Sequence, residues 1–142
     1  MKKPAAAKLA ERSHVEKQDQ WNVESLYPSL KEWEKDYALV CPATQTDAWK
    51  EIAQLKGTLS KGADAVKNAL ETLLSASRKL TKLYTYAHLR HDEDIADDTH
   101  KQAYNKILAS LHDFAEATSW FEPELLAMDE AAIYALLSSP TL

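Results

Sequence analysis

The strongest constraint on the fold of this chain is a long stretch of helical periodicity near its middle. Between residues 63 and about 91, apolar side chains recur at intervals of three and four residues: Val66, Leu70, Leu73, Leu80, Leu83, Tyr84 and Ala87. This spacing places them on one face of a helix. Only two glycines occur in 142 residues, which also favours helix. The pattern predicts one long amphipathic helix over about residues 63–91.

A second periodic stretch follows a short acidic run. Five of the seven residues 92–98 are carboxylates, and a second apolar stripe begins beyond them: Tyr104, Ile107, Leu108, Leu111, Phe114, Ala115 and Thr118. A side chain from residues 97–99 (Asp97, Asp98 or Thr99) suits the helix start, where free N–H groups and the positive dipole end favour an oxygen acceptor. The two stripes predict an antiparallel helix hairpin over about residues 63–91 and 98–121.

Shorter helices are expected beside the hairpin. One should start near Ser29 and end at Pro42, and a second should be capped by Thr46 or Asp47. Pro123 divides the remainder into a short helix and a last one. The expected fold class is all-α, a helical bundle built on the long hairpin. Residues 1–19 are predicted to form a flexible basic lead-in, and residues 20–142 one helical domain.

Charge and composition exclude several classes of partner. The chain has a net charge of −5, and residues 1–17 carry five Lys/Arg against two Glu, so the remaining residues are strongly acidic and should repel nucleic acid. No window approaches the roughly 20 apolar residues of a membrane span. Cys41 is the sole cysteine, which rules out an internal disulfide. We therefore expect a soluble, cytoplasmic protein with neither nucleic acid nor membrane as a partner.

The end of the first long helix concentrates polar side chains. His88 and His91 lie at positions i and i+3, with three acidic residues directly after them. His88, His91 and Asp94 could therefore contribute to a divalent metal site. Alternatively, the histidines are favoured at a helix C-terminus by the dipole, and the carboxylates form a solvated turn. Structural zinc sites normally use four ligands, often cysteines, which favours the second interpretation.

Catalytic motifs are missing from the sequence. No His-Glu-x-x-His run occurs, so the helix that binds zinc and activates water in many peptidases is absent. The serines lack a glycine-flanked elbow, Cys41 has no basic neighbour, and no glycine-rich phosphate loop is present. The four tryptophans are spaced with aliphatic residues, which favours packing over base or peptide stacking. Catalysis by this chain alone is not expected.

Two longer runs carry a resemblance to a known family. Residues 84–94 read Tyr-Thr-Tyr-Ala-His-Leu-Arg-His-Asp-Glu-Asp, and residues 117–125 read Ala-Thr-Ser-Trp-Phe-Glu-Pro-Glu-Leu. Together with weaker matches at residues 21–29, 33–36 and 55–59, they resemble the N-terminal part of oligoendopeptidase F-like enzymes, in the thimet-type family of zinc metallopeptidases. Residues 55–57, Leu-Lys-Gly, depart from the Phe-Arg-Gly form typical of the family.

The resemblance implies a complete protein several times longer that cuts short peptides in a deep channel. Its zinc would be bound by residues outside this chain, which would form a helical wall and support segment ending before the catalytic domain. Tyr86, His88, Arg90 and His91 are the candidates to face the channel or contact that domain. Short peptides and the catalytic domain are the implied partners, and exposed apolar helix faces would permit self-association. The alternative is a stand-alone helical module whose hairpin groove binds a partner helix.

Overall fold

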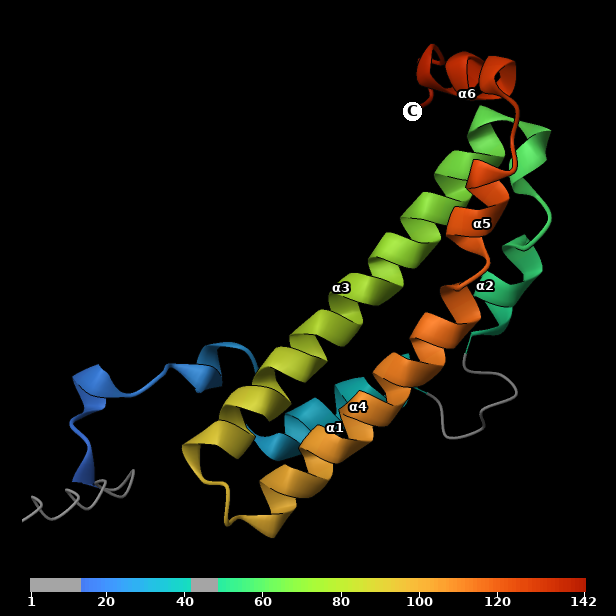
Figure 1. Ribbon diagram of the computed structural model, residues 1–142. Coiled ribbons are helices and arrows are strands. Elements are labelled where there is room, and N and C mark those ends of the chain that lie inside the picture. The colour runs from blue at the N-terminus through green and yellow to red at the C-terminus, as the bar shows by residue number, and fades with distance from the viewer. Residues whose placement is uncertain (1–13, 42–48) are drawn as a thin grey trace, which may run out of the picture.

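The structure, a computed structural model, describes residues 14–41 and 49–142, and these residues form helices without any strand (Figure 1). The all-α prediction is confirmed. The α-helices are α1 (Leu30–Val40), α2 (Lys50–Leu55), α3 (Ala63–Glu93), α4 (Asp98–Thr118), α5 (Phe121–Leu126) and α6 (Glu130–Leu137). Short 3-10 turns are η2 (Lys17–Asp19), η3 (Val23–Ser25) and η4 (Leu59–Lys61). The expected roles of Pro42, Thr46 and Asp47, and most of the basic lead-in, lie outside the described residues.

Helices α3 and α4 form the long axis of the molecule and run side by side in opposite directions (Figure 1). Helix α3 continues to Glu93, two residues beyond the expected end. Helix α4 ends at Thr118, three residues before the expected one. Pro123 accounts for the earlier end, because a proline ring inside a continuing helix would clash with the carbonyl four residues before it. The chain therefore turns at Ser119 and starts α5, where Pro123 falls in the first turn.

Helix α1 packs against the C-terminal half of α3 and against α4 (Figure 1). Ser29 caps it by accepting a hydrogen bond from the Glu32 N–H. The stacked rings of Trp33 and Tyr37 are buried, with centroids 5.1 Å apart. The indole Nε1 of Trp33 donates to the Leu83 carbonyl at 2.9 Å, and the Tyr37 hydroxyl lies 2.7 Å from Ser110 Oγ. Helix α1 is thus joined to both α3 and α4 by polar contacts inside an apolar core.

A second core lies at the other end of α3. Its buried members come from α2, η4, α3, α6 and the turn before α5: Ile52, Leu59, Val66, Ala69, Trp120 and Leu136. Glu124 joins α5 to the turn before α3, because its two carboxylate oxygens accept the Gly57 N–H at 2.7 Å and the Leu59 N–H at 2.8 Å. Gly57 has a φ of 79°, which side-chain-bearing residues rarely adopt. The turn thus presents both N–H groups to one carboxylate.

Within the described ranges, no helix combines the length and the apolar character that crossing a bilayer requires.

The cap of α4 gives a prediction about acid stability. Asp97 Oδ1 accepts the backbone N–H groups of Thr99 at 2.7 Å and His100 at 3.1 Å. These bonds, led by that from His100, hold the pKa of Asp97 below its ordinary value. The stabilisation is therefore complete above the unfolded pKa of about 3.9 and is lost as the pH falls through the lower folded pKa.

We expect Asp97→Ala to lower the free energy of unfolding at pH 7 and to flatten the stability change below pH 4, measured by urea denaturation. Asp97→Asn should keep most of the cap but also lose the acid dependence, because an amide does not titrate there. Asp98→Ala is the matched control one residue away. Equal behaviour of Asp97→Ala and Asp98→Ala would contradict the assignment of the cap.

Candidate functional site

Tyr86, His88, Arg90 and His91 lie on the last turns of α3, at the end that meets η3 and α4, and the weak metal candidate Asp94 follows directly after the helix. Tyr86 is fully buried, and its ring packs edge-on against Tyr27, with centroids 5.4 Å apart. The Tyr27 hydroxyl donates to the Asp36 carboxylate, and Lys82 Nζ lies 4.2 Å from the Tyr27 ring centroid. Tyr86 is therefore a core residue that holds the segment preceding α1 against α3.

Arg90 joins η3 to the end of α3. Its guanidinium donates from Nη1 to Glu93 Oε2 at 2.9 Å and from Nη2 to Glu24 Oε1 at 2.7 Å, and it lies over the Tyr86 ring. The side chains of Arg90 and Glu93 are only 14% and 6% exposed. Burial alone would lower the pKa of Arg90, but hydrogen bonds with Glu24, Tyr86 and Glu93 outweigh it, so the pKa is raised. Arg90 thus remains charged and ties η3 to α3.

The two histidines belong to a separate, partly exposed group of rings. The Tyr104 ring of α4 stacks on His88 at 5.3 Å and on His91 at 4.9 Å between centroids, and Tyr84 stacks on His88 at 5.2 Å. A hydrogen bond with Tyr84, followed by desolvation, raises the pKa of Tyr104. We call Tyr84, His88, His91 and Tyr104 the ring cluster.

Asp92 is the carboxylate that reaches this cluster. Its Oδ2 lies 3.2 Å from His88 Nε2, and its Oδ1 lies 3.3 Å from His91 Nδ1. Asp94, which the sequence suggested as a third ligand, lies past the helix end and accepts the Ala96 N–H at 3.0 Å instead. The i, i+4 spacing of His88 and Asp92 is the sequence signal that could have indicated Asp92 in place of Asp94.

A metal site does not form from these residues. Across the part of the chain that the structure describes, no group of three or more His, Cys, Asp or Glu side chains is arranged to hold a metal ion. The suggested set of His88, His91 and Asp94 is therefore not brought together. Zinc does not fit the described donor set.

Cys41 and three of the four tryptophans are packing residues. Burial raises the pKa of the Cys41 thiol, while Ser110 and Lys106 offset part of this effect, so the nucleophilic thiolate is disfavoured. Trp33, Trp49 and Trp120 take part in the two cores. Trp21 is more than half exposed.

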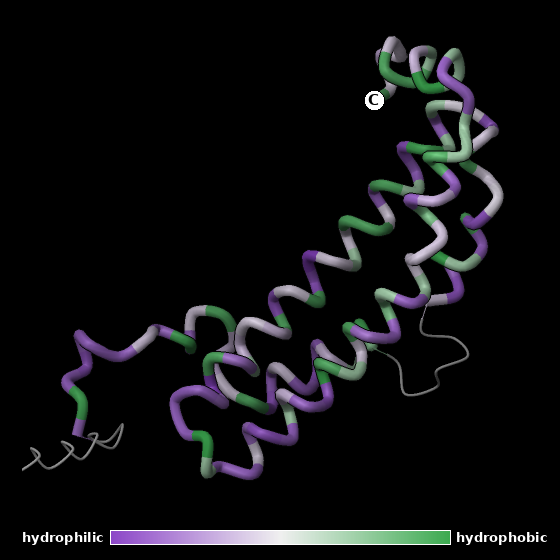
Figure 2. The backbone as a smooth tube through the Cα atoms, in the orientation of Figure 1, coloured by the Kyte–Doolittle hydropathy of each residue, from purple (hydrophilic) through white to green (hydrophobic). Residues whose placement is uncertain are grey.

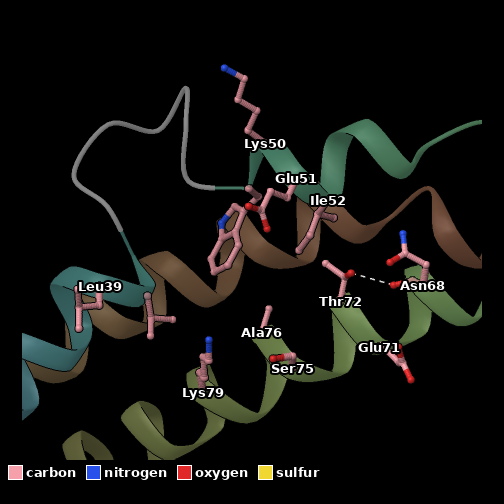
Figure 3. Close-up of a pocket in the computed structure, with 12 residues that line it drawn as sticks. Leu39, Lys50, Glu51, Ile52, Asn68, Glu71, Thr72, Ser75, Ala76 and Lys79 are labelled. Carbon is pink, nitrogen blue, oxygen red and sulfur yellow. Dashed lines mark hydrogen bonds between the residues drawn. The ribbon is translucent and has the colours of Figure 1, made fainter.

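An open groove, which the sequence did not indicate, runs between the end of α1, α2 and α3 (Figure 3). Its volume is about 880 Å³. Charged side chains such as Lys50, Glu51 and Lys79 line it beside apolar ones such as Ile52 and Ala76. The Thr72 hydroxyl donates to the Asn68 carbonyl at 2.8 Å within its own helix. The groove lies away from the hairpin end, and its lining among the described residues includes no histidine or cysteine.

No protein-family model matches the chain, but its sequence is similar to those of several bacterial oligopeptidases. Oligopeptidase PepF of Bacillus subtilis is 30% identical over 125 residues, which are 88% of this chain and 18% of that protein. Group B oligopeptidase PepB of Streptococcus agalactiae is 29% identical over 84% of this chain and 19% of its own length. The chain thus spans about a fifth of the length of these curated relatives.

Solved structures show the same partial match. A candidate peptidase from Chlamydophila abortus superposes with a TM-score of 0.83 and 34% identity, over 95% of this chain and 22% of that one. Oligoendopeptidase-F from Enterococcus faecium gives a TM-score of 0.67 and 30% identity, over 80% of this chain and 22% of its own. The fold is therefore that of a helical segment from a peptidase. By sequence and structure the chain is a homologue of the oligoendopeptidase F family, and the resemblance seen in the sequence is confirmed.

Arg90 gives a prediction about stability. Arg90→Met should lower the free energy of unfolding by about 2–3 kcal/mol, because it takes a paired guanidinium away from the nearly buried Glu93 carboxylate. Glu24→Gln should cost less than about 1 kcal/mol, because Glu24 is half exposed. Chemical denaturation measures both, with the exposed Arg78→Met on the same helix as control. Equal effects of Arg90→Met and Arg78→Met would show that Arg90 has no anchoring role.

Proposed function

We propose that this chain is the helical wall and support segment of a zinc-dependent oligoendopeptidase that hydrolyses short peptides in the cytoplasm. The observation that carries the proposal is the match to a candidate peptidase over 95% of this chain but only 22% of that one. A segment with this share of a larger fold has its activity completed by polypeptide outside it. The zinc would be held by residues of that polypeptide, because the described residues supply no ligand set.

The hairpin end supports a division of roles among the four candidates. Tyr86 and Arg90 are enclosed and hold η3 against α3, so we assign them to internal support. His88 and His91 are partly exposed and fixed by ring stacking. We assign these two to contact with the peptide or with the catalytic domain, since polar groups on a rigid helix can orient a ligand.

A chimera tests the proposed function. The segment of the Bacillus subtilis oligopeptidase that matches this chain is replaced by this chain, and a second protein simply lacks that segment. We expect the chimera to hydrolyse short fluorogenic peptides with chelator-sensitive activity and the deleted protein to be inactive. This chain alone should show no zinc-dependent turnover. Chelator-sensitive, zinc-restored activity of the isolated chain would overturn the proposal, as would a chimera no more active than the deletion.

The histidines are tested in the same chimera. His88→Ala and His91→Ala should each lower kcat/KM for short peptides by about three- to tenfold, mainly through KM, if they help to position substrate. His112→Ala, an exposed histidine on α4, is the control. Thermal melting of each variant separates a loss of contact from a loss of folding. Kinetics identical to those of His112→Ala would remove His88 and His91 from the substrate path.

A further inference from the structure

Helix α6 has an unusual composition for a helix at the surface. Seven of its eight residues are apolar, and Glu130 is the exception. Figure 2 shows several green, hydrophobic stretches along this helix, separated by paler and purple ones. Only Leu136 is buried, with Ala132 and Ile133 partly covered on the same side. Because a helix that is apolar all round is normally enclosed by protein, half of α6 lacks the cover that its sequence indicates.

The uncovered half of α6 is defined by large side chains. Tyr134 is 62% exposed and Leu137 is 75% exposed, and their i, i+3 spacing makes them neighbours on one face. We call this surface the outer face of α6. Figure 1 shows α6 lying across the N-terminal end of α3, so that one side of the short helix faces away from the bundle. The exposed Leu126 of α5 lies close in sequence and adds to the apolar surface of this region.

Two partners could cover the outer face of α6: a second copy of this chain, or a surface elsewhere in the same polypeptide. The area that each one needs distinguishes them. A stable dimer needs about 800 Å² of buried surface from each partner, and an eight-residue helix is only about 12 Å long. The outer face of α6 is too small to supply that area alone. A surface in the same polypeptide needs much less area, because a covalently connected partner binds at high effective concentration.

We infer that the outer face of α6 docks on an apolar surface in the part of an oligoendopeptidase F chain that lies outside this segment. This inference rests on the proposed function. It is supported by the solved peptidase-like chain, which contains the matched unit within a polypeptide more than four times as long. The docked α6 would join the support segment to the rest of the enzyme at the end of the bundle opposite the ring cluster.

The test uses the chimera described above. Tyr134→Lys and Leu137→Lys, singly and together, place a charge on the outer face of α6. Leu39→Lys makes the same chemical change at an 82% exposed position on α1. We expect the double variant to lower the yield of active chimera by about tenfold, because burying an unpaired charge in an apolar contact is unfavourable and weakens the docking. Its melting temperature should also fall, while Leu39→Lys should leave both quantities unchanged.

The isolated chain provides the matching measurement. The same substitutions should leave its melting curve unchanged, because both side chains are exposed in it. If the α6 variants match Leu39→Lys in an active chimera, the docking inference is overturned while the proposed function stands. If the unmodified chimera is as inactive as the deletion, both fall. A concentration-dependent dimer of the isolated chain, abolished by Tyr134→Lys in sedimentation experiments, would assign the face to a second copy and overturn the inference.

Discussion

The fold depends on covering the apolar stripe of α3. With 31 residues this helix is about 46 Å long, whereas the 21 residues of α4 reach only about 31 Å. One partner helix therefore leaves part of the stripe open. Helix α1 and α4 cover the part around Leu80 and Leu83, and α2, η4 and the residues after α4 cover the part around Val66 and Ala69. The two cores are consequences of this mismatch in length.

Polar contacts then fix how the covering elements sit. Apolar packing is not directional, but a buried donor must find an acceptor at a defined place. The Trp33 indole meets this requirement at the Leu83 carbonyl, which sets α1 against α3. Glu124 does the same at the other end by accepting two N–H groups of the turn at Gly57. This contact joins two of the runs singled out in the sequence, because residues 55–59 supply the donors and residues 117–125 the carboxylate.

The sequence predicts that α3 and α4 are long helices, because a period of three to four residues is local information, but it places their ends two and three residues away from those in the structure. The cap at the start of α4 also lies within three residues of its donors. The partner of Arg90 could not be found this way, since Glu24 is 66 residues distant and no spacing rule connects them. The sequence analysis names Asp94 as the carboxylate beside the histidines, whereas the structure brings Asp92 to both rings. Helix α3 continues through Glu93, where the Arg90–Glu93 pair lies within the last turn.

Helix geometry separates the four candidate residues at the hairpin end. At about 100° per residue, Tyr86 and Arg90 differ by about 40° around α3, whereas His88 lies on the opposite side and His91 lies about 100° from Arg90. The first pair meets η3, and the second stacks on Tyr104 of α4. Both faces of this helix end are therefore held by other elements. The two histidine rings are therefore placed by packing within the described residues, through their stacking on Tyr104.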